Sequence, residues 1–173
     1  MRFLPQMYRG GLMMEKLVLN RTPDEYSRRA GELFAKGYNC SQSVFLAFAD
    51  DIGMPFDMAA RLSSSFGGGM GRLREVCGAV SGMFMVTGIV CGYDDPEDHA
   101  EKTEHYKRIQ ELAGLFKEHT GSIICRELLG LDQKGASSHV PEKRTEEYYK
   151  KRPCRDMVEI AARITAEYLR EAK

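Results

Sequence analysis

The sequence predicts an all-α fold: a compact bundle of about six to eight helices around a buried central helix near residues 76–91. Three observations predict it. Apolar residues recur at spacings of three and four along most of the chain. Residues that start and end helices flank these stretches. No segment carries the strong alternation of apolar and polar residues that is typical of a half-buried strand.

The first two predicted helices have N-terminal caps that can be recognised in the sequence. Thr22 precedes Pro23, which suits the first helical position, and this helix ends at Gly37. Asn39 caps the next helix, and Gln42 follows three residues later in the spacing of a capping box.

A third helix is predicted from Pro55 to about Leu62, and the glycine-rich stretch 66–71 ends it because glycine disfavours helix. The central helix 76–91 then carries 16 consecutive uncharged residues. That run is shorter than the roughly 20 residues of a membrane span. A helix that is apolar on all sides in a soluble protein is usually buried.

The second half of the chain contains four more predicted helices. They are a long amphipathic helix over about 96–119, a short one capped by Ser122 that ends near Leu129, one over about 142–150, and a final one from Pro153. The predicted inward face of the long helix consists of Tyr106, Ile109, Ala113 and Phe116.

The length of 173 residues suits one domain, which we expect to span 22–173. We expect residues 1–21 to form a flexible or loosely docked segment, with Met1, Met13 or Met14 as the start of translation. Polar and charged residues interrupt every apolar stretch there, so no signal peptide is predicted and we expect a cytoplasmic protein.

The charge balance narrows the choice of partner. The chain has 25 Lys and Arg against 25 Asp and Glu, whereas binding to nucleic acid or to an anionic membrane needs a basic surplus. We therefore expect no nucleic acid and no membrane span. A partner protein or a homodimer stays open.

Five cysteines are the main chemical lead, because an odd number in a reducing compartment points away from structural disulfides. Cys40, Cys77, Cys125 and Cys154 each fall in the first turn of a predicted helix, where free N–H groups and the helix dipole favour thiolate. These four are the candidate metal ligands. Cys91 lies 14 residues after Cys77, about 21 Å along the helix, and is expected to be a buried small apolar residue.

Glycines accompany these cysteines. The candidate cofactor-binding residues are Gly67, Gly68, Gly69, Gly71 and Gly78. Glycine-rich backbone can turn successive N–H groups toward an anion, a sulfide or a thiolate. Gly78 and Gly82, four residues apart, would let a cofactor or another helix approach closely, and tight helix packing alone explains them equally well.

Two neighbouring features bear on the site. Arg152 and Arg155 flank Cys154 and are expected to lower its pKa or to attract an acidic partner. The polar segment 132–153 lies between two of the candidate cysteines, and its length suggests a lid over the site.

The motifs around the cysteines resemble a known family. YNCSQSV at Cys40, FGGGMGR, VCGAVSG at Cys77, ICRELLG at Cys125 and PCRDMV at Cys154 are similar to the redox-active family named for its pattern C_GCAxxG_C_C. The resemblance covers about 24–170. It implies a redox protein whose four cysteines, Cys40, Cys77, Cys125 and Cys154, gather at one site.

Three functions stay open at this point. The first is an electron-transfer site with a four-thiolate iron–sulfur cluster of [2Fe–2S] type, serving a redox partner protein. The second is thiol–disulfide or persulfide chemistry without a metal. The third is a structural Cys₄ zinc site. No substrate and no acid–base pair can be read from the sequence, so no catalytic residue is assigned.

Overall fold

The computed structural model describes residues 19–131 and 137–171. Most of the N-terminal segment predicted to be flexible, and the residues 132–136 of the predicted lid, lie outside this part. The elements are α1 (Pro23–Ala35), α2 (Cys40–Ala47), α3 (Phe56–Ser63), η1 (Ser64–Phe66), α4 (Gly67–Met70), α5 (Gly78–Cys91), α6 (His99–Thr120), α7 (Cys125–Leu128), α8 (Glu146–Lys151) and α9 (Cys154–Glu171).

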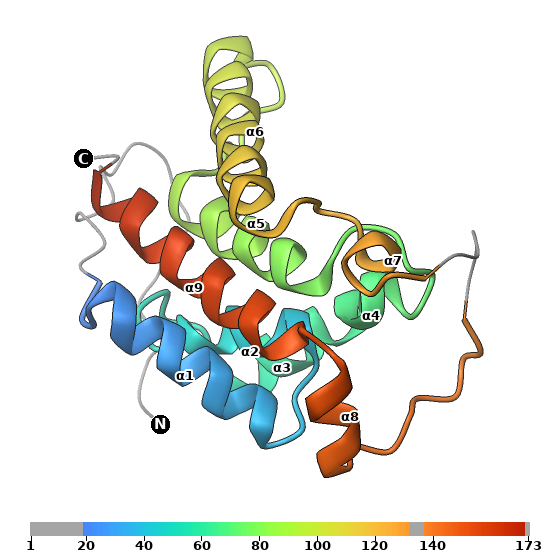
Figure 1. The fold of residues 1–173 in the computed structure, drawn as a ribbon. Helices are drawn as coiled ribbons and strands as arrows, with labels where there is room; N and C mark the ends of the chain where they lie inside the picture. Colours follow the sequence, from blue (N-terminus) through green and yellow to red (C-terminus); the bar gives the residue numbers. More distant parts are fainter. Residues whose placement is uncertain (1–18, 132–136, 172–173) are drawn as a thin grey trace.

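The all-α prediction is confirmed over the described residues (Figure 1). The most extensive packing between two helices is that of α1 against α9, which lie side by side. Beneath them α2 packs against α1, α3, α5 and α9, and its residues 44–49 are almost completely buried. The N-terminal half of the predicted central helix, α5, is buried as well, whereas Ile89 near its end is 42% exposed. The centre of the bundle is therefore shared by α2 and α5.

Two predicted caps are present in full. The Thr22 side chain accepts from the backbone N–H of Glu25, and the Glu25 carboxylate accepts from the N–H of Thr22. Asn39 and Gln42 exchange the same pair of hydrogen bonds at the start of α2. These contacts fix the start of α2, and with it the position of Cys40.

Three predicted helix starts are shifted along the chain. Asp98, not Pro96, precedes α6, since its carboxylate accepts from a first-turn N–H. The Ser122 hydroxyl accepts from the N–H of Ile124, and α7 begins only at Cys125. Thr145, rather than Pro141, caps α8. At α6 and α8 a side chain that accepts from the backbone decides the start, whereas α7 begins without a side-chain cap.

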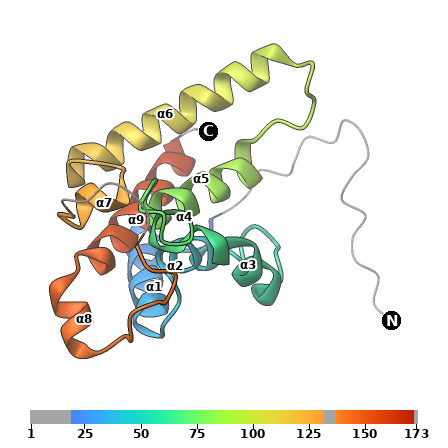
Figure 2. The ribbon, with the colours of Figure 1, turned by 90° about the vertical axis from the view of Figure 1, so that its right-hand side faces the viewer.

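One residue of the predicted inward face is misplaced. Tyr106 is 51% exposed, and its hydroxyl contacts that of Tyr93. The buried residues of α6 are Leu112 and Phe116, in the half that lies on α5 and α9. The other half extends away from the bundle (Figures 1 and 2), which accounts for the exposure of Tyr106.

The glycine-rich stretch forms a tight turn, as its composition predicts. Although the label α4 covers part of it, the backbone is left-handed from Gly68 through Arg72, with φ between 60° and 71°. Arg74 shares this conformation at φ 65°. Left-handed backbone is unstrained for glycine and costs free energy at Arg72 and Arg74. No helix in the described part of the chain is long and apolar enough to span a membrane.

Candidate functional site

The four cysteines predicted to share a site line one pocket, which has a volume of about 200 Å³. Cys40, Cys125 and Cys154 are the first residues of α2, α7 and α9, and Cys77 immediately precedes α5. Cys91, at the far end of α5, is not among the lining residues. Four helix starts therefore meet at one place, and the fifth cysteine lies elsewhere.

An isolated antiparallel bridge between Val76 and Ile124 brings the second and third cysteines together. On one side of it the N–H of Cys77 donates to the carbonyl of Ile123 at 2.8 Å. On the other, the N–H of Cys125 donates to the carbonyl of Glu75 at 2.7 Å. These two hydrogen bonds join segments that are about 50 positions apart in the sequence. This pairing was not predicted, because a bridge of one residue leaves no alternating pattern in the sequence.

The candidate glycines fall into two groups. Gly67, Gly68 and Gly78 line the pocket, whereas Gly69 and Gly71 do not. A Cβ atom at Gly69 would nevertheless lie 2.6 Å from the Cβ of Cys125. These residues therefore let the chain pass directly against the cysteines.

Close helix packing accounts for the two glycines of α5. A Cβ atom at Gly78 would lie 2.9 Å from the Phe66 carbonyl oxygen and 3.1 Å from the Cβ of Cys40. At Gly82 it would lie 2.8 Å from the Ser41 carbonyl oxygen. All three distances are shorter than ordinary van der Waals contact, so α2 can lie this close to α5 only because both residues are glycine.

The protonation of the cysteines departs from the prediction that a first-turn position favours thiolate. Burial raises the pKa of Cys77 to about 12, although the backbone N–H groups of Ala79 and Val80 act in the opposite direction. Burial also raises the pKa of Cys125. The loss of water around a buried thiolate outweighs the favourable helix end.

Cys154 is the exception. The pKa of Cys154 is lowered to about 7, chiefly by a hydrogen bond from the Cys40 thiol and also by nearby arginines, against the effect of burial. The same hydrogen bond, together with burial, raises the pKa of Cys40 well above its ordinary value. Cys40 and Cys154 thus form a pair in which one sulfur carries the proton and the other is readily ionised.

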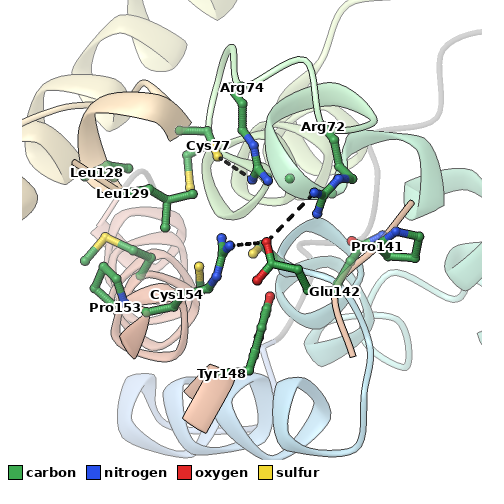
Figure 3. A pocket seen from close by; sticks show the side chains of 18 of the residues that line it. Arg72, Arg74, Cys77, Leu128, Leu129, Pro141, Glu142, Tyr148, Pro153 and Cys154 are labelled. Carbon is green, nitrogen blue, oxygen red and sulfur yellow. Dashed lines mark hydrogen bonds and ion pairs between the residues drawn. The ribbon is translucent and has the colours of Figure 1, made fainter. Parts of the chain in front are cut away.

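Arginines surround the sulfurs, as Figure 3 shows in part. Of the charged side chains lining the pocket in the described residues, four are arginines and one is a carboxylate: Arg72, Arg74, Arg144, Arg152 and Glu142. Glu142 pairs with Arg152 and lies 3.9 Å from Arg72. Positive charge therefore predominates next to the cysteines.

One buried arginine reaches a cysteine sulfur. Arg74 is only 4% exposed, and its Nη1 donates to the Sγ of Cys125 at 3.8 Å. Its Nε donates to the hydroxyl of Ser137 at 2.7 Å, which holds the guanidinium in place.

Residues 137–153, which we call the strap, cross the pocket. The backbone N–H of Ser137 donates to the carbonyl of Arg72 at 3.0 Å, and Arg72 Nε donates to the carbonyl of Ser138 at 2.6 Å. Pro141, Glu142, Arg144, Tyr148, Arg152 and Pro153 of the strap line the pocket. The described part of the predicted lid therefore does lie against the site.

The two arginines that flank Cys154 have different roles. Arg152 lines the pocket and lowers the pKa of Cys154. Arg155 instead pairs with Glu159 at 2.9 Å, one turn along α9, and does not line the pocket. The prediction holds for Arg152, whereas Arg155 is directed along the helix surface.

Comparison with known proteins gives one result. Residues 38–168 match the family described as "Putative redox-active protein (C_GCAxxG_C_C)". The chain belongs to this family. No curated protein and no solved structure matches the chain. All four pocket cysteines lie inside the matched region, and membership of the C_GCAxxG_C_C family supports a redox role for them.

Several pocket residues were not found from the sequence. Arg72, Arg74, Glu142, Arg144 and Tyr148 come from two segments far apart in the chain, and none is next to a cysteine. The family pattern C_GCAxxG_C_C names cysteines, glycines and one alanine, and no charged residue. The signal for Glu142, Arg144 and Tyr148 was their place in the predicted lid. For Arg72 and Arg74 it was their place at the end of the glycine-rich stretch, where left-handed backbone redirects the side chains.

Proposed function

We propose that the four-cysteine pocket holds an iron–sulfur cluster, most simply of [2Fe–2S] type, and transfers electrons to or from a partner protein. The observation that carries the proposal is the meeting of four cysteines, from four helix starts, around one pocket of about 200 Å³. Four thiolates are the usual ligand set of such clusters.

The donor set and its spacing suit a cluster better than a single ion. A tetrahedral zinc ion with Zn–S bonds of about 2.3 Å needs its four sulfurs only about 3.8 Å apart. In the described residues no three His, Cys, Asp or Glu side chains lie close enough together to hold one metal ion. Bridging sulfides separate the two irons of a [2Fe–2S] core and so spread its cysteine ligands more widely. The arrangement therefore favours a cluster over the zinc alternative.

The residues of this chain have distinct tasks in such a site. Cys40, Cys77, Cys125 and Cys154 would be the ligands, each losing its proton on binding. Bound there, the group supplies a reversible one-electron couple. The pocket arginines compensate negative charge on the sulfurs, and the strap limits access of water from one side.

The test is anaerobic reconstitution with iron and sulfide, followed by iron, sulfide and zinc analysis and a visible spectrum. We expect two irons and two sulfides per chain for a [2Fe–2S] core. Replacement of Cys154 by Ser should abolish or strongly change the spectrum. Replacement of Cys91 by Ser is the matched control and should leave it unchanged. A colourless, iron-free wild-type protein would refute the proposal, and one equivalent of zinc would support a structural site instead.

A second candidate rests on the contact between Cys40 and Cys154. With the pKa of Cys154 lowered to about 7, its thiolate can attack a disulfide, and one thiolate leaves. Cys40, after losing its proton, then attacks the Cys154 sulfur and releases the second thiol. The cysteine pair is oxidised by two electrons to a disulfide, and the substrate disulfide is reduced to two thiols.

Thiol counting on the metal-free protein tests this candidate. Mild oxidation with a disulfide reagent should remove two thiols together, and mass spectrometry should locate them at Cys40 and Cys154. The Cys40→Ser variant should stop at the mixed disulfide. Loss of single thiols in both proteins would contradict the pairing.

A further inference from the structure

The guanidinium of Arg74 is a buried charge that pairs with no carboxylate of the described residues. Its side-chain partners within the described residues are the Ser137 hydroxyl and the Cys125 sulfur. A buried cation needs a compensating negative charge, since a neutral hydroxyl cannot replace lost hydration. The Cys125 sulfur, which the guanidinium contacts, can carry one as a thiolate.

Arg74 also has a strained backbone, in addition to its buried charge. Its φ of 65° lies in the left-handed region, which is costly for a residue with a long side chain. Such strain persists where surrounding contacts determine it, and it is enriched at functional sites. Here the backbone carbonyl of Arg74 accepts from the N–H of Arg126 at 3.2 Å, and Ser137 holds the side chain. The fold thus maintains an unfavourable backbone conformation that directs this guanidinium toward the Cys125 sulfur.

We propose that Arg74 is the buried counter-ion of the four-cysteine site and raises its reduction potential, and that Glu142 acts in the opposite direction. The proposal rests on the electron-transfer function proposed above. A cluster with four thiolate ligands is anionic and gains another negative charge on reduction. A fixed positive charge next to a ligand sulfur stabilises the reduced form more than the oxidised form.

Glu142 opposes this effect through two other arginines. Its carboxylate pairs with Arg152 and lies 3.9 Å from Arg72, so it neutralises part of the positive charge on the strap side of the pocket. Arg74 has no such carboxylate among the described residues and acts undiminished. Arg74 is a positioning and charge-setting residue, because it contacts the sulfur of Cys125, which would be a ligand of the cluster.

The experiment is a spectroelectrochemical titration of the reconstituted full chain and its variants. In Arg74→Gln we expect the equilibrium constant for reduction to fall roughly tenfold, which lowers the potential by about 59 mV for one electron. Arg74→Lys keeps the charge and should restore most of the shift. Arg126→Gln is the matched control, because Arg126 directly follows Cys125 but pairs with Glu75 at 3.3 Å.

Glu142→Gln provides an independent arm with the opposite sign. It should raise the potential, and it decides the proposal if Arg74→Gln fails to assemble the cluster. If Arg74→Gln has the same potential as wild type and the Arg126→Gln control, the charge-setting role alone is overturned. An unchanged potential in Glu142→Gln would overturn it as well. A wild-type protein without iron would instead overturn the proposed function.

Discussion

Replacing Gly82 by Ala should destabilise the protein, although alanine is the better helix former. The new Cβ atom would lie 2.8 Å from the Ser41 carbonyl oxygen and 2.9 Å from the Cβ of Val44. Ordinary carbon contacts begin near 3.5 Å, so α2 must move by roughly 0.6 Å or more. Overpacking of this kind costs about 1–3 kcal/mol, and the gain in helix propensity returns at most about 1 kcal/mol. We expect a net loss of about 1–2 kcal/mol.

The same substitution at Gly88 is the control, because it lies in the same helix and nothing surrounds its added Cβ within 4 Å. Gly88→Ala should be neutral or stabilising by up to about 1 kcal/mol. Thermal and urea unfolding followed by circular dichroism measure both. A loss of 1 kcal/mol lowers Tm by about 2–4 °C in a chain of this size. A Gly82→Ala variant as stable as Gly88→Ala would refute the close approach of α2 and α5.

Two further outcomes follow from the contacts at the start of α2 and α9. Asn39→Ala removes the cap of α2 and the hydrogen bond that Asn39 Nδ2 donates to the Ser64 carbonyl. It should lower the free energy of unfolding in urea by about 1–2 kcal/mol. An unchanged midpoint would contradict the role of the cap. In the metal-free protein, alkylation of Cys154 by iodoacetamide should accelerate as the pH rises through about 7, whereas in Cys40→Ala the same increase should occur at higher pH, because the largest contribution to the lowered pKa is lost. The stabilisation from the Cys154 thiolate is present above the ordinary thiol pKa and is lost as the pH falls through about 7; identical pH profiles in the two proteins would show that the hydrogen bond from Cys40 is not the cause.

The parts of the fold that depend on local sequence were predictable. The capping boxes at Thr22 and Asn39 start α1 and α2 where the sequence indicates. The start of α7 was misplaced, because the Ser122 hydroxyl contacts the backbone before the helix begins. Tyr106 belongs to the predicted apolar face of α6 and yet is exposed, because helical spacing gives a face but not the length over which another helix covers it.

The surroundings of the cysteines were less predictable, for a physical reason. Arg74 and Glu142 reach the pocket from segments that follow different cysteines, and left-handed backbone directs the first of them. Side-chain direction in such a turn cannot be read from apolar spacing. Charge compensation at the site is therefore a property of the folded chain.

By itself, the sequence determined that Cys40, Cys77, Cys125 and Cys154 stand at helix starts and that Cys91 does not, because caps, prolines and apolar spacing act within a few residues. Only the tertiary structure decided that those four helix starts surround one pocket. It also decided their protonation. Burial raises the pKa of Cys77 and Cys125, the hydrogen bond with Cys154 together with burial raises that of Cys40, and the same hydrogen bond and the arginines lower that of Cys154. Burial and charge depend on residues distant in sequence, so a helix start alone could not reveal them.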